Sequence, residues 1–231
     1  MLKVKEEILK FIVNTCVNKD QESIKTYEFG IGKTGEENVD NGRAIALWNM
    51  IYNNFINNGS AAGIVPLKIH RGNIWTAVAA YIESTGEFIM VFKKANLKKI
   101  MSNPNNGHYA TIANTSNGNL LPIQQEFFPS SEFDEGLIFR YELLCDELFK
   151  KIGVIPKKVI LAGFTEFEFK TYIYNKRQQL VAEHDYSYLI DSRYDDLLKE
   201  QYDVTPPFKE INRIANKRKE PRKRINGLKK N

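Results

Sequence analysis

A short charged stretch in the C-terminal half of the chain has the residue types of a catalytic pattern. Glu168 and Lys170 are separated only by Phe169, which is the E-x-K spacing found in many metal-dependent nucleases. In such a site, carboxylates hold Mg²⁺ and the lysine polarises the scissile phosphate. The same spacing is also typical of a half-buried β-strand with a charged outer face. The stretch therefore supports two hypotheses, a nuclease site and a structural strand.

The alternation of residue types over 166–174 predicts a strand with two unlike faces. A turn at 175–178 and a second strand at 179–190 complete a predicted hairpin. The inner face of the first strand comprises Phe167, Phe169, Thr171 and Ile173, and the outer face comprises Glu166, Glu168, Lys170, Tyr172 and Tyr174.

The pairing of this hairpin decides whether a second carboxylate joins Glu168. If the turn centres on Lys176–Arg177, Lys170 faces Glu183 and Glu168 faces Asp185. Directly opposed carboxylates, about 5 Å apart, repel one another unless a cation lies between them. The catalytic candidates are therefore Glu168, Lys170 and Asp185, with Glu183 as an additional acid. Mg²⁺ or Mn²⁺ is implied only by the nuclease hypothesis, and no cofactor is expected otherwise.

Two arginines and one histidine are further candidates for ligand contact. Arg43 follows Gly42, Arg71 precedes Gly72, and His108 lies at the end of a loop rich in Asn and Gly. A guanidinium group binds phosphate or carboxylate well, and a neighbouring glycine lets a ligand approach the backbone. The alternative is that these are ordinary surface residues at turns. The three histidines share no metal-ligand spacing, so no metal site is predicted from them.

The glycine-rich segment 30–35 resembles part of a phosphate-binding loop. That loop requires a glycine five residues before the glycine of the Gly-Lys-Thr motif, and Tyr27 occupies the position. It also requires a helix that opens at the lysine, whereas the residues that follow are typical of a loop. The segment is therefore predicted to be a turn.

Positive charge is concentrated at the C-terminal end of the sequence. Residues 212–231 contain nine Lys or Arg residues and one acid, a net charge of +8, whereas the other 211 residues carry 24 basic and 27 acidic side chains, a net charge of −3. So charged a segment cannot form a core, and 206–231 is predicted to be a disordered or helical tail. Basic arms bind nucleic acid by releasing counterions. The predicted nucleic-acid-binding residues are Arg213, Lys217, Arg218, Lys219, Arg222, Lys223, Arg224, Lys229 and Lys230.

The remaining periodicities predict one α+β domain over residues 1–205, with an antiparallel sheet or sheets of about six strands packed with four to five helices. A helix is expected to begin after a cap at Asp40 or Asn41, and 102–119 is expected to be a loop. The other expected helices lie at 3–17, 95–101, 132–152 and 192–201, and the other expected strands at 64–70, 74–83, 87–93 and 158–162.

Composition excludes some classes of protein. The sequence has no run of 18 apolar residues, and its first residues lack the apolar region of a signal peptide. The two cysteines, Cys16 and Cys145, have neither metal nor redox spacing and are predicted to be reduced core residues. We therefore expect a cytoplasmic protein that makes no membrane contact.

Several short motifs between residues 38 and 190 are similar to those of a group of uncharacterised proteins from low-GC Gram-positive bacteria and their mobile elements. The resemblance implies a phage, mobile-element or host-defence setting, and it transfers no catalytic residue. The motifs are Asn41-Gly42 before Trp48, Arg71-Gly72 before Trp75, and His108-Tyr109 with Asn114.

Three functions remain open from the sequence. The preferred hypothesis is a non-enzymatic interaction protein whose basic tail helps it to bind nucleic acid or a nucleoprotein complex. The second is a Mg²⁺- or Mn²⁺-dependent nuclease that uses the E-x-K residues. The third is an inhibitor that binds a host or phage protein through its folded body.

Overall fold

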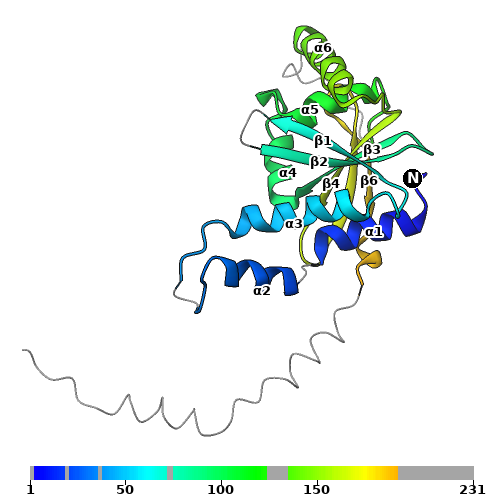
Figure 1. Ribbon diagram of the computed structural model, residues 1–231. Coiled ribbons are helices and arrows are strands. Elements are labelled where there is room, and N and C mark those ends of the chain that lie inside the picture. The colour runs from blue at the N-terminus through cyan, green and yellow to red at the C-terminus, as the bar shows by residue number, and fades with distance from the viewer. Residues whose placement is uncertain (1–2, 19–20, 36–37, 72–74, 124–134, 192–231) are drawn as a thin grey trace, which may run out of the picture. The chain divides into compact units, whose positions relative to one another are not determined.

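The computed structural model of the chain describes residues 3–18, 21–35, 38–71, 75–123 and 135–191 (Figure 1). The chain divides into two units, residues 1–190 and 191–231. All of the helices and strands given below belong to the first unit. The helix predicted at 192–201, the domain boundary predicted after residue 205 and the basic tail lie outside the described residues.

The first unit is built on one six-stranded sheet in which the strands follow chain order. All neighbouring strands are antiparallel except β3 and β4, which are parallel. The α+β class is therefore confirmed, but the sheet is mixed and not purely antiparallel. The connection from β3 to β4 contains helices and returns the chain to the end of the sheet at which β3 began, so β4 runs parallel to β3. The strands are β1 (Val65–Arg71), β2 (Trp75–Ile82), β3 (Glu87–Lys93), β4 (Lys158–Phe164), β5 (Phe169–Tyr174) and β6 (Leu180–Asp185).

The helices differ from the expected set mainly in two short elements. The segment 102–119, expected to be a loop, contains the helix α5 and two 3-10 turns. In α5 and the turn that follows it, small and polar residues are buried, and the hydroxyls of Thr111 and Thr115 donate to backbone carbonyls three residues earlier. Helix α2 was not expected at all. The helices are α1 (Glu6–Val17), α2 (Gln21–Gly30), α3 (Arg43–Asn58), α4 (Lys94–Met101), α5 (Tyr109–Asn114) and α6 (Glu135–Ile152).

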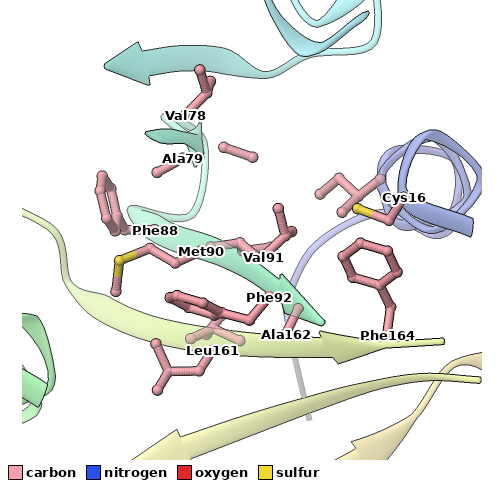
Figure 2. Packing of buried hydrophobic residues seen from close by; sticks show 14 of the residues in the cluster. Cys16, Val78, Ala79, Phe88, Met90, Val91, Phe92, Leu161, Ala162 and Phe164 are labelled. Carbon is pink, nitrogen blue, oxygen red and sulfur yellow. The ribbon is translucent and has the colours of Figure 1, made fainter. Parts of the chain in front are cut away.

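Helices cover both faces of the sheet, as adjacent residues of β4 show. Phe164 and Gly163 point to opposite faces. The ring of Phe164 lies 5.8 Å from that of Trp48 in α3, and it also packs near Cys16 of α1 (Figure 2). On the other face, a Cβ atom at Gly163 would lie only 3.1 Å from Leu97 of α4. The absence of a side chain at Gly163 therefore lets α4 approach the sheet closely.

The core lies between the sheet and these two helical layers. Its central strands, β3 and β4, are buried along nearly their whole length, and Figure 2 shows their side chains packing on both sides. Phe88 of β3 meets Phe149 of α6 edge to face, with ring centroids 5.3 Å apart. Cys16 and Cys145 are buried free thiols, as predicted, and burial raises the pKa of both.

The start of α3 corrects a predicted helix cap. Gly42 occupies the N-cap position and has no side chain to donate or accept. Asp40 accepts a hydrogen bond from the hydroxyl of Tyr27 at 2.8 Å, and so its carboxylate joins α2 to the loop before α3. The predicted cap by Asp40 or Asn41 is therefore wrong.

In the part of the chain that the structure describes, none of the helices has the length and apolar character needed to cross a bilayer.

Candidate functional sites

The E-x-K residues lie at the start of the β5–β6 hairpin, with a register that differs from the predicted one. Lys170 pairs with Asp185, and Tyr172 pairs with Glu183. Glu168 precedes β5 and has no strand partner. The predicted pairings of Glu168 with Asp185 and of Lys170 with Glu183 are therefore wrong by two residues. Phe167, placed on the inner face by the alternation, is 84% exposed because it lies before the strand.

Two local features shift this register. The turn closes with Asn175 opposite Gln179, since the N–H of Asn175 donates to the Gln179 carbonyl at 3.0 Å. The loop therefore has one residue more than the predicted turn, and Gln178 adopts a left-handed φ of 59° to complete it. A bulge then leaves Val181 without a partner. Each feature moves the pairing by one residue.

Lys170 nevertheless lies among the acids that the sequence singled out. Its Nζ atom is 3.5 Å from Glu168, 3.0 Å from Glu183 and 3.9 Å from Asp185. Lys94 of α4 also bonds to Glu168. The ammonium of Lys170 thus occupies the position between Glu168 and Asp185 that the nuclease hypothesis gives to a metal ion.

The pKa shifts in this cluster are those of an ion-pair network in which the charged groups stabilise one another. The hydrogen bond from Lys94 lowers the pKa of Glu168, and a hydrogen bond from Ser187 lowers that of Asp185. The bond to Glu183 raises the pKa of Lys170. All of these shifts favour the charged forms. Among the described residues, no group of three or more His, Cys, Asp or Glu side chains is arranged to hold a metal ion.

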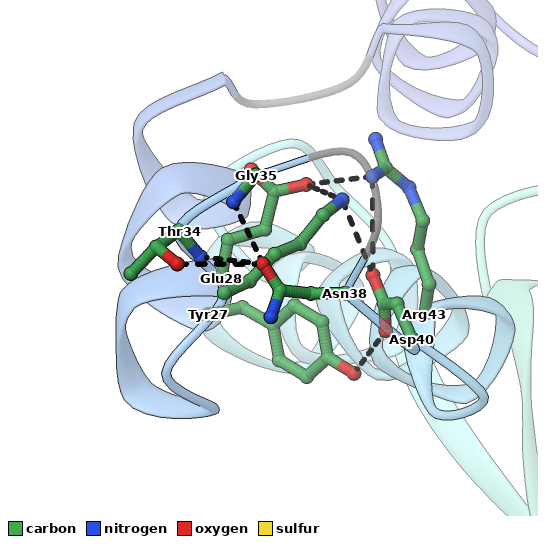
Figure 3. Close-up of polar contacts among 8 residues, drawn as sticks. Tyr27, Glu28, Thr34, Gly35, Asn38, Asp40 and Arg43 are labelled. Atoms are coloured by element: carbon green, nitrogen blue, oxygen red, sulfur yellow. Dashed lines mark hydrogen bonds and ion pairs between the residues drawn. The ribbon is translucent and has the colours of Figure 1, made fainter. Parts of the chain in front are cut away.

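Arg43 lies in a second ion-pair network, between α2 and α3 (Figure 3). Its Nη1 atom is 2.6 Å from Glu28 and 3.9 Å from Asp40. Lys33 contacts the same two carboxylates at 3.0 and 3.9 Å. The side chain of Asn38 accepts hydrogen bonds from the N–H groups of the predicted glycine-rich turn. The guanidinium group of Arg43 is therefore already bound by carboxylates that join α2 to the loop before α3.

Arg71 and His108, two of the predicted contact residues, lie next to each other although they are 37 positions apart in the chain. Nη1 of Arg71 is 3.3 Å from Nε2 of His108, and the guanidinium carbon lies 4.7 Å from the centre of the Tyr109 ring. The imidazole ring also contacts the rings of Phe92 and Tyr109. Burial, with a smaller effect of the Arg71 charge, lowers the pKa of His108 to about 4.

A groove between α4 and β5 contains functional candidates that the sequence analysis did not select. Its volume is about 320 Å³. The residues that line it are Tyr172 and Tyr174 of β5, Lys94, Leu97, Lys98 and Met101 of α4, and Ser102 directly after α4. The two tyrosine rings are nearly parallel, with an interplanar angle of 27° and centroids 6.4 Å apart. Their alternation on the outer face was visible in the sequence, but the approach of α4 was not.

A protein family matches the chain over residues 2–227, and it is described as a family of unknown function, DUF5986. The chain belongs to the DUF5986 family. This match confirms the predicted resemblance to uncharacterised proteins and extends it to nearly the whole chain. No curated protein matches the chain, and neither does any solved structure.

The nine predicted nucleic-acid-binding residues of the C-terminal segment lie outside the described residues.

Among the described candidates, the structure brings together the E-x-K residues in one network and Arg71 with His108 in another cluster. It places Arg43 apart from both, in the α2–α3 network.

Proposed function

We propose that this DUF5986 protein is a non-enzymatic protein that binds single-stranded nucleic acid. The observation that carries the proposal is the pair of stacked tyrosines, Tyr172 and Tyr174, in a groove beside Lys94 and Lys98. Proteins that bind single strands without sequence preference combine aromatic rings, on which bases stack, with cations that follow the backbone.

The charges around the groove support a binding role for Lys98. Lys94 is paired with Glu168, and Lys170 is paired with the surrounding acids. Lys98 is exposed and forms no ion pair with any described residue. It is therefore the groove cation that is available to a phosphate, and a base on Tyr172 or Tyr174 would lie beside it.

The C-terminal charge adds the long-range attraction that this proposal needs. Residues 212–231 carry a net charge of +8, and the other 211 residues carry −3. Binding by counterion release through such a segment depends steeply on salt. We expect the C-terminal segment to supply electrostatic affinity and the tyrosine groove to supply the preference for unpaired bases.

The test is fluorescence anisotropy with labelled DNA and RNA single strands of about 15 nucleotides and with a duplex of the same length. The double variant Tyr172→Ala/Tyr174→Ala should bind the single strands about fivefold to more than a hundredfold more weakly, because stacking contributes about 1–3 kcal/mol per base. Tyr172→Phe/Tyr174→Phe should retain the binding, since phenylalanine keeps the aromatic face.

Tyr188→Ala is the matched control, because Tyr188 is 69% exposed and does not line the groove. Deletion of residues 212–231 should lower the affinity and flatten its dependence on salt. If the double alanine variant binds single strands as the wild type does while remaining folded, the groove is not the binding site. If the wild type prefers the duplex, the proposed ligand is wrong.

The setting of the protein is part of the same proposal. The resemblance to proteins of low-GC Gram-positive bacteria and their mobile elements supports a role in a phage, mobile-element or defence context in the cytoplasm. Binding of a protein partner through the body, the inhibitor hypothesis, would be favoured over this proposal if a specific protein co-purified with the chain lacking residues 212–231.

A further inference from the structure

The contact between Arg71 and His108 is unusual because both atoms in it are hydrogen-bond donors. Nδ1 of His108 accepts a hydrogen bond from the backbone N–H of Ala110 at 3.1 Å. A neutral imidazole has one proton, so when Nδ1 accepts, the proton is on Nε2. Nε2 is the atom that lies 3.3 Å from Nη1 of Arg71, and a guanidinium group has only donors. The two groups therefore cannot satisfy each other.

Protonation of the imidazole does not remove this conflict. The doubly protonated ring would lose the bond from Ala110 and would place a second positive charge beside Arg71. Burial and that neighbouring charge keep the pKa of His108 near 4, so the ring is neutral at pH 7. The free protein thus holds an N–H donor of His108 and an N–H donor of Arg71 with their nitrogens 3.3 Å apart.

No protein acceptor within the described residues resolves the conflict. Among the described residues, the Arg71 side chain forms no ion pair with a carboxylate, and besides His108 it packs over the face of Tyr109. Lys170 on β5 has Glu183 beside it, whereas no carboxylate of the described residues forms an ion pair with Arg71. An acceptor with two oxygen atoms would satisfy both donors at once.

The two donors are also held in place before any ligand arrives. Arg71 ends β1 and packs over Tyr109. The turn before His108 is fixed by Tyr141 of α6, whose hydroxyl accepts from the N–H of Gly107 at 2.8 Å and donates to the carbonyl of Pro104 at 3.0 Å. Groups that are ordered in advance lose less entropy on binding.

We infer that Arg71 and His108 form a binding site for a phosphate group, which accepts one hydrogen bond from the guanidinium group and one from Nε2–H of the imidazole. Arg71 supplies the charge, and His108 supplies direction as a neutral donor. The phosphate comes from a free nucleotide, from inorganic phosphate or from a nucleic-acid strand. These residues do not line the tyrosine groove, so the inference stands or falls separately from the proposed function.

The first experiment measures the tautomer of His108 by long-range ¹H–¹⁵N correlation NMR of the full chain at pH 7. With only three histidines in the sequence, the resonances can be assigned from single substitutions. The expected result is a neutral ring protonated at Nε2. A ring protonated at Nδ1 would let Arg71 donate to Nε2 and would overturn the inference.

The second experiment follows the same resonances while inorganic phosphate, a nucleoside monophosphate, and oligonucleotides with a 5′-phosphate or a 5′-hydroxyl are added. Arg71→Gln should weaken binding about tenfold or more, since hydrogen bonds between charged groups are the strong ones. Binding to Arg71→Gln is followed through the His108 resonances, which this substitution leaves in place. His108→Asn, followed through backbone amides, should also bind more weakly while keeping the helix cap, because an Asn oxygen can accept from Ala110.

Arg140→Gln is the charge-matched control, because Arg140 is exposed on α6. The tightest of the four ligands identifies the source of the phosphate: a gain from the 5′-phosphate over the 5′-hydroxyl points to a strand end, and a gain for the monophosphate over inorganic phosphate points to a free nucleotide. If none binds more tightly to the wild type than to Arg71→Gln, the inference is wrong.

Discussion

Lys170 and Arg71 are cations on the same sheet with opposite surroundings. Lys170 on β5 has three carboxylates within 4 Å. Arg71 on β1 has the N–H of His108 and the face of Tyr109. Both residues were candidates for a functional site on the basis of residue type alone. The difference between them is whether the protein itself supplies the opposite charge.

This contrast teaches that a cluster of charges is not in itself a sign of function. In the Lys170 network each charge has a partner within the protein. Near Arg71, a positive charge and a neighbouring donor both lack an acceptor among the described residues. These two donors lie at an exposed position, where water or a phosphate group can accept from them.

The largest effect, on the free energy of unfolding, is expected from removing a buried side chain whose hydrogen bonds are all made within the protein. The buried side chain of Asn117 donates to the carbonyls of Val159 and Tyr174 and accepts from the N–H of Val159, all within 2.9 Å. Asn117→Ala leaves these groups unpaired and should lower the free energy of unfolding by about 3 kcal/mol. Urea denaturation measures this. Asn53→Ala on the exposed face of α3 is the control, with an expected change within about 0.5 kcal/mol.

An intermediate effect is expected from removing the central cation of the satisfied network. Lys170→Met leaves Glu168, Glu183 and Asp185 without the shared ammonium, so the melting temperature should fall at pH 7. Lys94 is the main cause of the lowered pKa of Glu168 and Ser187 that of Asp185, and the charge of Lys170 adds to both shifts. This stabilising contribution is present above the unfolded pKa values and is lost as the pH falls through the lowered pKa values of the folded state. The difference between variant and wild type should therefore shrink at pH 3, as measured by circular dichroism. An equal difference at both pH values would contradict the electrostatic explanation.

Added Mg²⁺ distinguishes this network from a metal site. In Lys170→Met the carboxylates that have lost the ammonium of Lys170 should bind the ion and recover part of the lost melting temperature, whereas the wild type should not respond. If instead the wild type is stabilised by Mg²⁺ or Mn²⁺ and cleaves plasmid DNA or RNA, and Glu168→Ala abolishes both effects, the nuclease hypothesis is favoured over the proposed function.

The smallest effect, a change in phosphate affinity, is expected from substituting Arg43. Its guanidinium group is committed to Glu28 and Asp40, so Arg43→Gln should change phosphate affinity by less than about twofold, in contrast to Arg71→Gln. The same NMR titration measures both variants. A loss at Arg43 as large as that at Arg71 would show that partnered and unpartnered arginines do not differ in this protein.

Much of the secondary structure could be predicted because it depends on local periodicity. The alternation around Lys170 correctly predicted β5, with Phe169, Thr171 and Ile173 buried. It failed at Phe167 and in the pairing of β6, because a left-handed Gln178 and a bulge at Val181 depend on the closed turn and not on alternation. The helix α5 was missed because its polar residues are buried by contacts with distant elements.

The sequence by itself determined the class of the fold, the strand order in its hairpins and the residue types available for binding, since these follow from patterns within about ten neighbouring positions. It also determined the concentration of positive charge in residues 212–231. Only the tertiary structure decided which charges are partnered. Arg71 contacts His108, and α4 lies beside Tyr172, although many residues separate each pair in the sequence. Whether an acceptor lies near a donor depends on packing between elements, which no local pattern specifies.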